Sequence, residues 1–96
     1  MIYNVVTIPP FIKRLRRLAI KYPSLKNEYL QLVALLESNP TTGISIGNHC
    51  YKIRIAIASK GKGKSGGARI FSLVKFFDNT VFLLAIFDKS EQENMT

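Results

Sequence analysis

The sequence predicts an α+β domain with the element order β-α-α-β-β-β, in which a helical hairpin packs on a largely antiparallel sheet. Two segments of the first half carry apolar residues at helical spacing, and three segments of the second half are rich in β-branched and aromatic residues. The chain has 96 residues, of which 47% are hydrophobic, and it contains no internal repeat or linker-like stretch. We therefore expect a single domain over residues 1–96.

The first elements are a strand and a basic helix. Residues 2–7 are predicted as a strand, which Pro9 and Pro10 end while presetting the first turn of a helix over residues 9–22. Its apolar stripe comprises Phe11, Leu15, Leu18, Ala19 and Tyr22, and its remaining surface carries Lys13, Arg14, Arg16, Arg17 and Lys21. No acidic residue interleaves to form i,i+4 pairs, which favours an anion contact over a merely solvated face.

A second helix is expected after the break at Pro23. Ser24 is predicted to cap it, and Asn39 and Pro40 end it near residue 38. Its apolar positions are Leu25, Tyr29, Leu32, Val33 and Leu36. Two amphipathic helices joined by so short a break form a hairpin, and a hairpin of this kind needs a sheet to cover its apolar faces.

The predicted sheet uses residues 50–58, 68–76 and 80–87, with a hairpin turn at Asp78 and Asn79 between the last two strands. Phe71 and Phe77 are expected in the core rather than in a platform for nucleobases. The spacing of Ser90 and Glu93 matches a capping box and predicts the start of a further helix.

Basic residues gather in the second half of the chain. Alternation along the 50–58 strand places Lys52 and Arg54 on one face and Tyr51, Ile53, Ile55 and Ile57 on the other. A glycine-rich loop follows with three lysines, and Arg69 begins the next strand; the loop lysines are Lys60, Lys62 and Lys64. Glycines let the backbone approach an anion closely, so this region is predicted to bind phosphate.

Composition limits the partners and the compartment. With 14 Lys and Arg against 6 Asp and Glu, the formal net charge is +8, which favours nucleic acid or an acidic protein as the partner. The N-terminus lacks a targeting pattern and no apolar run approaches the ~20 residues that span a bilayer, so no membrane is expected. Cys50 is the only cysteine, which excludes an internal disulfide and fits a cytoplasmic protein.

The glycine-lysine loop imitates two nucleotide-binding motifs without matching either. Gly63-Lys64-Ser65 resembles the end of a Walker A motif, but Ala58 occupies the position of its first glycine and no helix is predicted next. Residues 61–66 match the letters of Gly-x-Gly-x-x-Gly, yet the segment that follows is β-branched and aromatic. We expect neither a nucleotide P-loop nor a dinucleotide site, and no cofactor.

The run Tyr51-Lys52-Ile53-Arg54, the lysine-glycine loop, Gly67-Ala68-Arg69-Ile70 and the ending of residues 87–91 together resemble the RelE/ParE toxin superfamily, within it the RelE and HigB branch. The resemblance covers nearly the whole chain. It implies a type II toxin that cleaves messenger RNA in the ribosomal A site and is held inactive by a cognate antitoxin. It also implies that Lys52, Arg54 and Arg69 contact the scissile phosphate.

Elementary chemistry assigns roles to these three residues. RNA cleavage by the 2′-hydroxyl needs a positioned backbone and cations that neutralise the phosphoryl oxygens. Arg54 and Arg69 suit bidentate phosphate contacts, and Lys52, crowded by other cations, is predicted to act as general base. Further RNA contacts are expected from Lys60, Lys62, Lys64, Lys89, Arg14 and Arg17. Relatives in the RelE branch also use an arginine and a tyrosine near the C-terminus, whereas here Ser90 follows Lys89 and no tyrosine follows Tyr51.

Cleavage is predicted to be metal-independent. His49, the only histidine, has no second histidine with which to form a ribonuclease-type pair, and the sequence contains few metal ligands.

Two alternative functions stay open from the sequence. A gyrase-inhibiting toxin of the ParE branch shares the fold, although gyrase binding does not require a phosphate site. A non-catalytic domain that binds RNA or the ribosome would use the same cations only to position phosphates.

Overall fold

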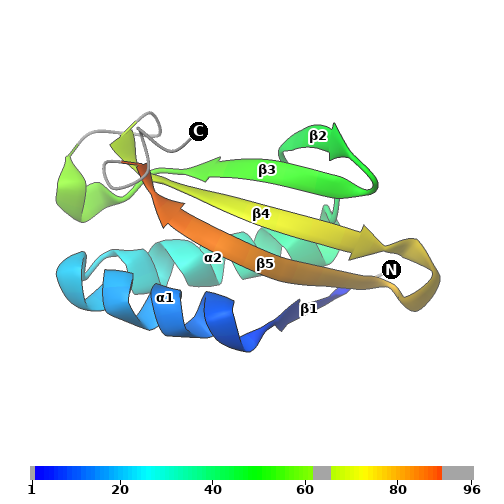
Figure 1. The fold of residues 1–96 in the computed structure, drawn as a ribbon, viewed down its shortest axis with the longest axis horizontal. Helices are drawn as coiled ribbons and strands as arrows, with labels where there is room; N and C mark the ends of the chain where they lie inside the picture. Colours follow the sequence, from blue (N-terminus) through cyan, green and yellow to red (C-terminus); the bar gives the residue numbers. More distant parts are fainter. Residues whose placement is uncertain (1, 62–65, 90–96) are drawn as a thin grey trace.

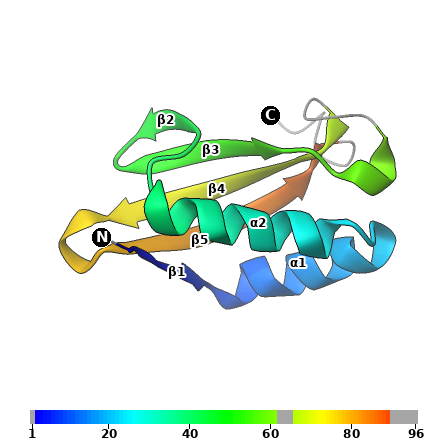
Figure 2. The same ribbon diagram turned by 180° about the vertical axis from the view of Figure 1, so that it is seen from behind.

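The computed structural model describes residues 2–61 and 66–89. Their order is β1 (Asn4–Thr7), α1 (Pro9–Lys21), α2 (Leu25–Ser38), β2 (Ile44–Gly47), β3 (Cys50–Ile55), η1 (Ala58–Lys60), β4 (Ala68–Lys75), η3 (Phe76–Asp78) and β5 (Thr80–Asp88). The helix α2 lies behind β5 in Figure 1 and in front of it in Figure 2, and α1 lies beside α2 along the β5 edge of the sheet. The predicted α+β fold class is therefore confirmed.

The sheet has five strands in the order β1-β5-β4-β3-β2. Only β1 runs parallel to its neighbour, β5, and the other three pairings are antiparallel. The predicted hairpin between β4 and β5 is present, and Asn79 adopts a left-handed backbone in its turn, with φ 48°. The helix start predicted at Ser90 lies outside the described residues.

One strand of the sheet was absent from the predicted order. The four residues of β2 pair antiparallel with the first half of β3 through a turn at Asn48 and His49, whose φ angles are 54° and 63°. Two left-handed residues form the type I′ turn that suits a two-residue hairpin. All four residues of β2 are exposed, so no contrast between buried and exposed positions marked it.

The core lies between the helices and one face of the sheet. The buried residues of the helices all belong to the predicted stripes, namely Phe11, Leu15, Leu18, Leu25, Leu32 and Leu36. The other predicted stripe residues are half-buried, namely Ala19, Tyr22, Tyr29 and Val33. The buried helix residues pack against residues on one face of the sheet, namely Ile53, Ile55, Ile70, Val74, Val81, Leu83 and Ile86. Alternation along β5 is broken once, between Leu83 and Ile86, where its pairing with β4 shifts register. Alternation then sends the intervening side chains of β3, β4 and β5 to the opposite face, which no described helix covers.

Ser24 occupies the predicted N-cap position of α2, but its side chain makes no cap hydrogen bond. Its hydroxyl instead lies 2.8 Å from Ser59 Oγ and accepts a hydrogen bond from the Ser59 backbone N–H at 2.9 Å. Glu28 Oε2 accepts from the Ala58 N–H at 2.6 Å. The start of α2 thus holds η1, the short turn after β3, because the polar groups of that turn find their partners on the helix.

Candidate nucleic-acid interface

On the uncovered face of the sheet, paired side chains of neighbouring strands lie in rows across the strands. Arg54 of β3 is paired with Arg69 of β4, and Arg69 with Phe87 of β5. In the next row Lys52 is paired with Phe71, and Phe71 with Ala85. Directly paired residues of antiparallel strands have Cα atoms roughly 4.5–5.5 Å apart. Lys52 and Arg54 share one face, as alternation predicts, and the strand register adds Arg69 beside them.

Three cations lie in these rows, namely Lys52, Arg54 and Arg69. Arg54 is exposed, while Lys52 and Arg69 are half-buried. Arg69 Nε is buried without a hydrogen-bond partner. Within residues 2–61 and 66–89, no carboxylate forms an ion pair with any of the three. Since neighbouring cations repel one another, this arrangement favours an anion that binds all three.

A second basic surface lies on α1, and one of its residues, Arg14, contacts Phe87 in the rows on the sheet. The Arg14 guanidinium carbon lies 5.1 Å from the centre of the Phe87 ring, at the distance of a cation–π contact. Arg16 and Arg17 are exposed further along the helix. A shallow groove on this side of α1 is lined by Pro9, Pro10, Ile12, Lys13, Arg14, Arg16, Arg17 and Ile20. Four cations and no carboxylate line it, which suits a polyanion.

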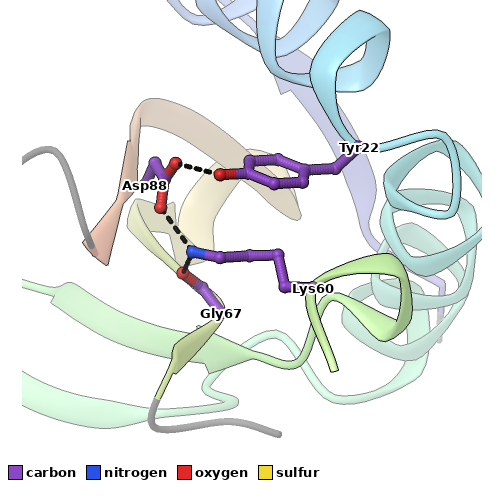
Figure 3. A network of polar contacts seen from close by, with 4 residues as sticks. All are labelled: Tyr22, Lys60, Gly67 and Asp88. Carbon is purple, nitrogen blue, oxygen red and sulfur yellow. Dashed lines mark hydrogen bonds and ion pairs between the residues drawn. The ribbon is translucent and has the colours of Figure 1, made fainter. Parts of the chain in front are cut away.

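Lys60 was predicted on the phosphate-binding surface, and the structure corrects that expectation. Its amine lies 2.6 Å from Asp88 Oδ1, with 6% of the lysine side chain and 0% of the aspartate side chain exposed. The Tyr22 hydroxyl donates to Asp88 Oδ2 at 2.9 Å, and the Lys60 amine also donates to the Gly67 carbonyl oxygen at 3.5 Å (Figure 3). A buried lysine needs such a partner, so Lys60 joins η1 to β5 instead of facing an external phosphate.

The other predicted contacts have mixed outcomes. Lys62 and Lys64 lie outside the described residues. Lys89 is half-buried directly after β5, and its backbone N–H donates to the Gly67 carbonyl oxygen at 3.2 Å. His49 lies in the turn between β2 and β3, where its ring packs against Phe76 at 5.4 Å. Five residues of strand separate His49 from Arg54, roughly 16 Å, so the histidine stands apart from the rows.

The expectation that Phe71 and Phe77 belong to the core is wrong. Phe77 is fully exposed in η3. Phe71 is half-buried on the uncovered face and contacts Phe87 edge to face, with ring centres 5.8 Å apart. Phe87 was not among the predicted site residues. Its neighbours Ile86 and Asp88 are buried, so alternation along β5 places Phe87 on the uncovered face.

Searches against protein-family models and against curated proteins give no match. Solved structures do match. An arginine-to-alanine double mutant of Escherichia coli toxin RelE in the free state has a TM-score of 0.69 at 17% identity, over 97% of this chain and 90% of that one. The isolated E. coli RelE toxin has a TM-score of 0.65 at 22% identity, over 90% and 83%. The intact E. coli RelBE toxin-antitoxin complex has a matching chain with a TM-score of 0.62 at 22% identity, over 88% and 93%.

These likenesses establish that the chain has the fold of the RelE toxin, which the sequence resemblance predicted. No helix within the described part of the chain is long and apolar enough to cross a membrane. Among the same residues, no three histidine, cysteine, aspartate or glutamate side chains gather where they could hold a metal ion.

Proposed function

We propose that this protein is the toxin of a type II toxin-antitoxin system and a ribosome-dependent endonuclease that cleaves messenger RNA in the A site. The observation that carries the proposal is the Arg54–Arg69 pair beside Lys52, three cations on one uncovered face with no described carboxylate to neutralise them. The RelE fold supports the same reading, because that fold belongs to a named toxin with an antitoxin complex.

The proposed reaction is an in-line displacement within the RNA. The 2′-oxygen attacks the adjacent phosphorus, the bond to the 5′-oxygen of the next nucleotide breaks, and a 2′,3′-cyclic phosphate and a 5′-hydroxyl result. Lys52, in the unprotonated form that a base requires, takes the proton of the 2′-hydroxyl, and the departing 5′-oxygen takes up a proton from water. Arg54 and Arg69 bind the non-bridging phosphoryl oxygens, on which negative charge grows in the transition state. No step uses a metal or a cofactor.

The antitoxin is the proposed protein partner. A chain with a formal net charge of +8 attracts an acidic protein, and a ligand that binds only the folded domain also stabilises it. A groove between α2 and β3 is lined mainly by apolar residues, including Leu32, Leu35, Ile53 and Ile55, and its charged lining residues are Arg54 and Glu28. Such a groove suits an antitoxin segment with apolar and acidic side chains.

Induction of the protein in a bacterial host, followed by mapping of messenger 5′ ends on ribosomes, tests the proposal. Arg69→Ala should remove the cuts within translated codons, since loss of one transition-state donor lowers the rate roughly 10²–10³-fold. Lys75→Ala is the matched control, because Lys75 is an exposed cation at the other end of the same strand. Activity in excess chelator, with ribosome integrity checked separately, tests metal independence.

The same experiment separates the competing functions. Growth arrest with DNA damage and intact messengers would support the gyrase-inhibiting toxin instead. Ribosome binding that depends on Arg69, without any cleavage product, would support the non-catalytic binder.

A further inference from the structure

We propose that Phe71, Phe87 and Arg14 form a stacking subsite for a nucleobase beside the phosphate-binding cations. The inference rests on the proposed function and specifies the part of the substrate that these residues contact. Both rings lie on the uncovered face of the sheet, half-buried and outside the core cluster. They touch edge to face at 5.8 Å, so each ring holds the other in place.

The strand register places the rings next to the cations. Phe87 is the direct neighbour of Arg69 in one row, and Phe71 is the direct neighbour of Lys52 in the other. Adjacent strands lie about 4.8 Å apart, so a ring and a cation are separated by a single strand spacing. A phosphate held by Arg54 and Arg69 therefore has its own nucleoside within reach of Phe87 or Phe71.

Arg14 extends this surface from the neighbouring helix. Its guanidinium carbon lies 5.1 Å from the centre of the Phe87 ring. An arginine guanidinium is planar and cationic, and proteins that bind single-stranded nucleic acid stack bases on such groups as well as on aromatic rings. The α1 cations and the sheet cations thus meet at the proposed base site.

Aromatic rings next to cations distinguish this surface from one whose rings only shield the sheet from solvent. Half-buried aromatic rings lie among cations that form no ion pair within the described part of the chain. They match the two requirements of single-strand binding, a charged track for the backbone and rings for the bases. Phe82 lies on the same strand, five residues before Phe87, and is paired with Leu73 instead of Arg69. Its ring is half-buried, and the Lys75 amine lies 5.9 Å from the ring centre. It therefore offers a matched ring outside the proposed subsite.

Ribosomes programmed with a message that cannot be cleaved, because the attacking 2′-hydroxyl of the A-site codon is replaced by hydrogen, provide the test. The fluorescent base 2-aminopurine is placed at each position of that codon in turn. We expect quenching at one position when the protein binds, and loss of that quenching in Phe87→Leu and Phe71→Leu. Phe82→Leu should quench as the unaltered protein does.

An abasic nucleotide at the same position makes the test independent of any variant. It should weaken binding of the unaltered protein roughly tenfold, within the range of base–aromatic stacking. Equal affinity for abasic and complete messages at every codon position, or quenching that survives both Phe71→Leu and Phe87→Leu, would overturn the subsite and leave the phosphate site intact. Failure to bind programmed ribosomes at all would overturn the proposed function and this inference with it.

Discussion

The Lys60 amine and the Asp88 carboxylate form a buried ion pair, 2.6 Å apart, that joins η1 to the last residue of β5. Because β4 lies between β3 and β5 in the sheet, the pair spans the start of the strand that carries Arg69. The contact to the Gly67 carbonyl oxygen places the same amine next to that start. A buried charge pair outside the site thus fixes the backbone on both sides of the arginine pair.

Lys60→Met should lower the free energy of unfolding by about 3–5 kcal/mol, because it leaves the Asp88 carboxylate buried without its cation. Urea denaturation measures the loss. Lys26→Met, which changes an exposed lysine of α2, should shift it by less than about 0.5 kcal/mol.

The single variant Asp88→Asn and the double variant Lys60→Met, Asp88→Asn complete a double-mutant cycle with Lys60→Met. Because the double variant removes both charges and keeps an acceptor for Tyr22, it should be less destabilised than the sum of the two single variants. Additive losses would show that packing of the lysine stem, and not the charge pair, is responsible.

Gly67 should tolerate no side chain. A Cβ at this position would overlap the carbonyl oxygen of Ile55 on the neighbouring strand. Gly67→Ala must therefore separate the start of β4 from β3, and we expect a loss of about 3 kcal/mol or more. It should also impair cleavage, because Arg69 follows two residues later and depends on the same strand pairing.

Gly61→Ala is the comparison for Gly67→Ala. A Cβ there meets no atom, and the cost is limited to its left-handed backbone, with φ +72°, or about 1–2 kcal/mol. Thermal unfolding of both variants ranks them, and an equal loss would contradict the steric argument.

The elements of this fold were predictable where burial repeats at short range. Phe11, Leu15 and Leu18 recur at helical spacing, and Ile53 and Ile55 alternate along β3, so both classes of element were found. The strand β2 was missed because its residues are all exposed, leaving a short sequence with no buried face.

The residues of the candidate site were likewise predictable only where the pattern that marks them is local in the sequence. Lys52 and Arg54 share a face by local alternation, which the sequence displays. Lys60 was misassigned because its partner, Asp88, is 28 residues away and becomes its neighbour only through the sheet. Phe71 was misassigned because its aromatic side chain suggested burial, although alternation along β4 places it on the same face as Arg69, two residues earlier.

Tyr29 should make stability depend on alkaline pH. Burial raises the pKa of its phenol above the usual 10.0, since desolvation disfavours the phenolate. The folded state then holds the proton more tightly than the unfolded state. The associated stability is complete below pH 10 and is lost as the pH rises above 10 toward the raised value.

Tyr29→Phe should remove this part of the alkaline loss while keeping the ring contact with Phe11 at 6.1 Å. Urea denaturation between pH 9 and 11 compares the two proteins, and the lysines common to both cancel in the difference. Curves that stay parallel across this range would show that the phenol titrates alike in both states.

Substitutions of cations on α1 should weaken ribosome binding, whereas substitutions of cations on the sheet should slow cleavage. Arg17→Gln removes an exposed cation of α1, so it should weaken ribosome binding and reduce the slope of log affinity against log salt by about 1. At saturating protein, the rate of cleavage of the bound message should not change. Arg69→Gln should instead slow that single-turnover rate roughly 10²–10³-fold, because it removes a donor to the phosphoryl oxygens. Comparable slowing by Arg17→Gln would place the helix cations at the reacting phosphate, and an unchanged rate in Arg69→Gln would exclude the arginine pair as the catalytic centre.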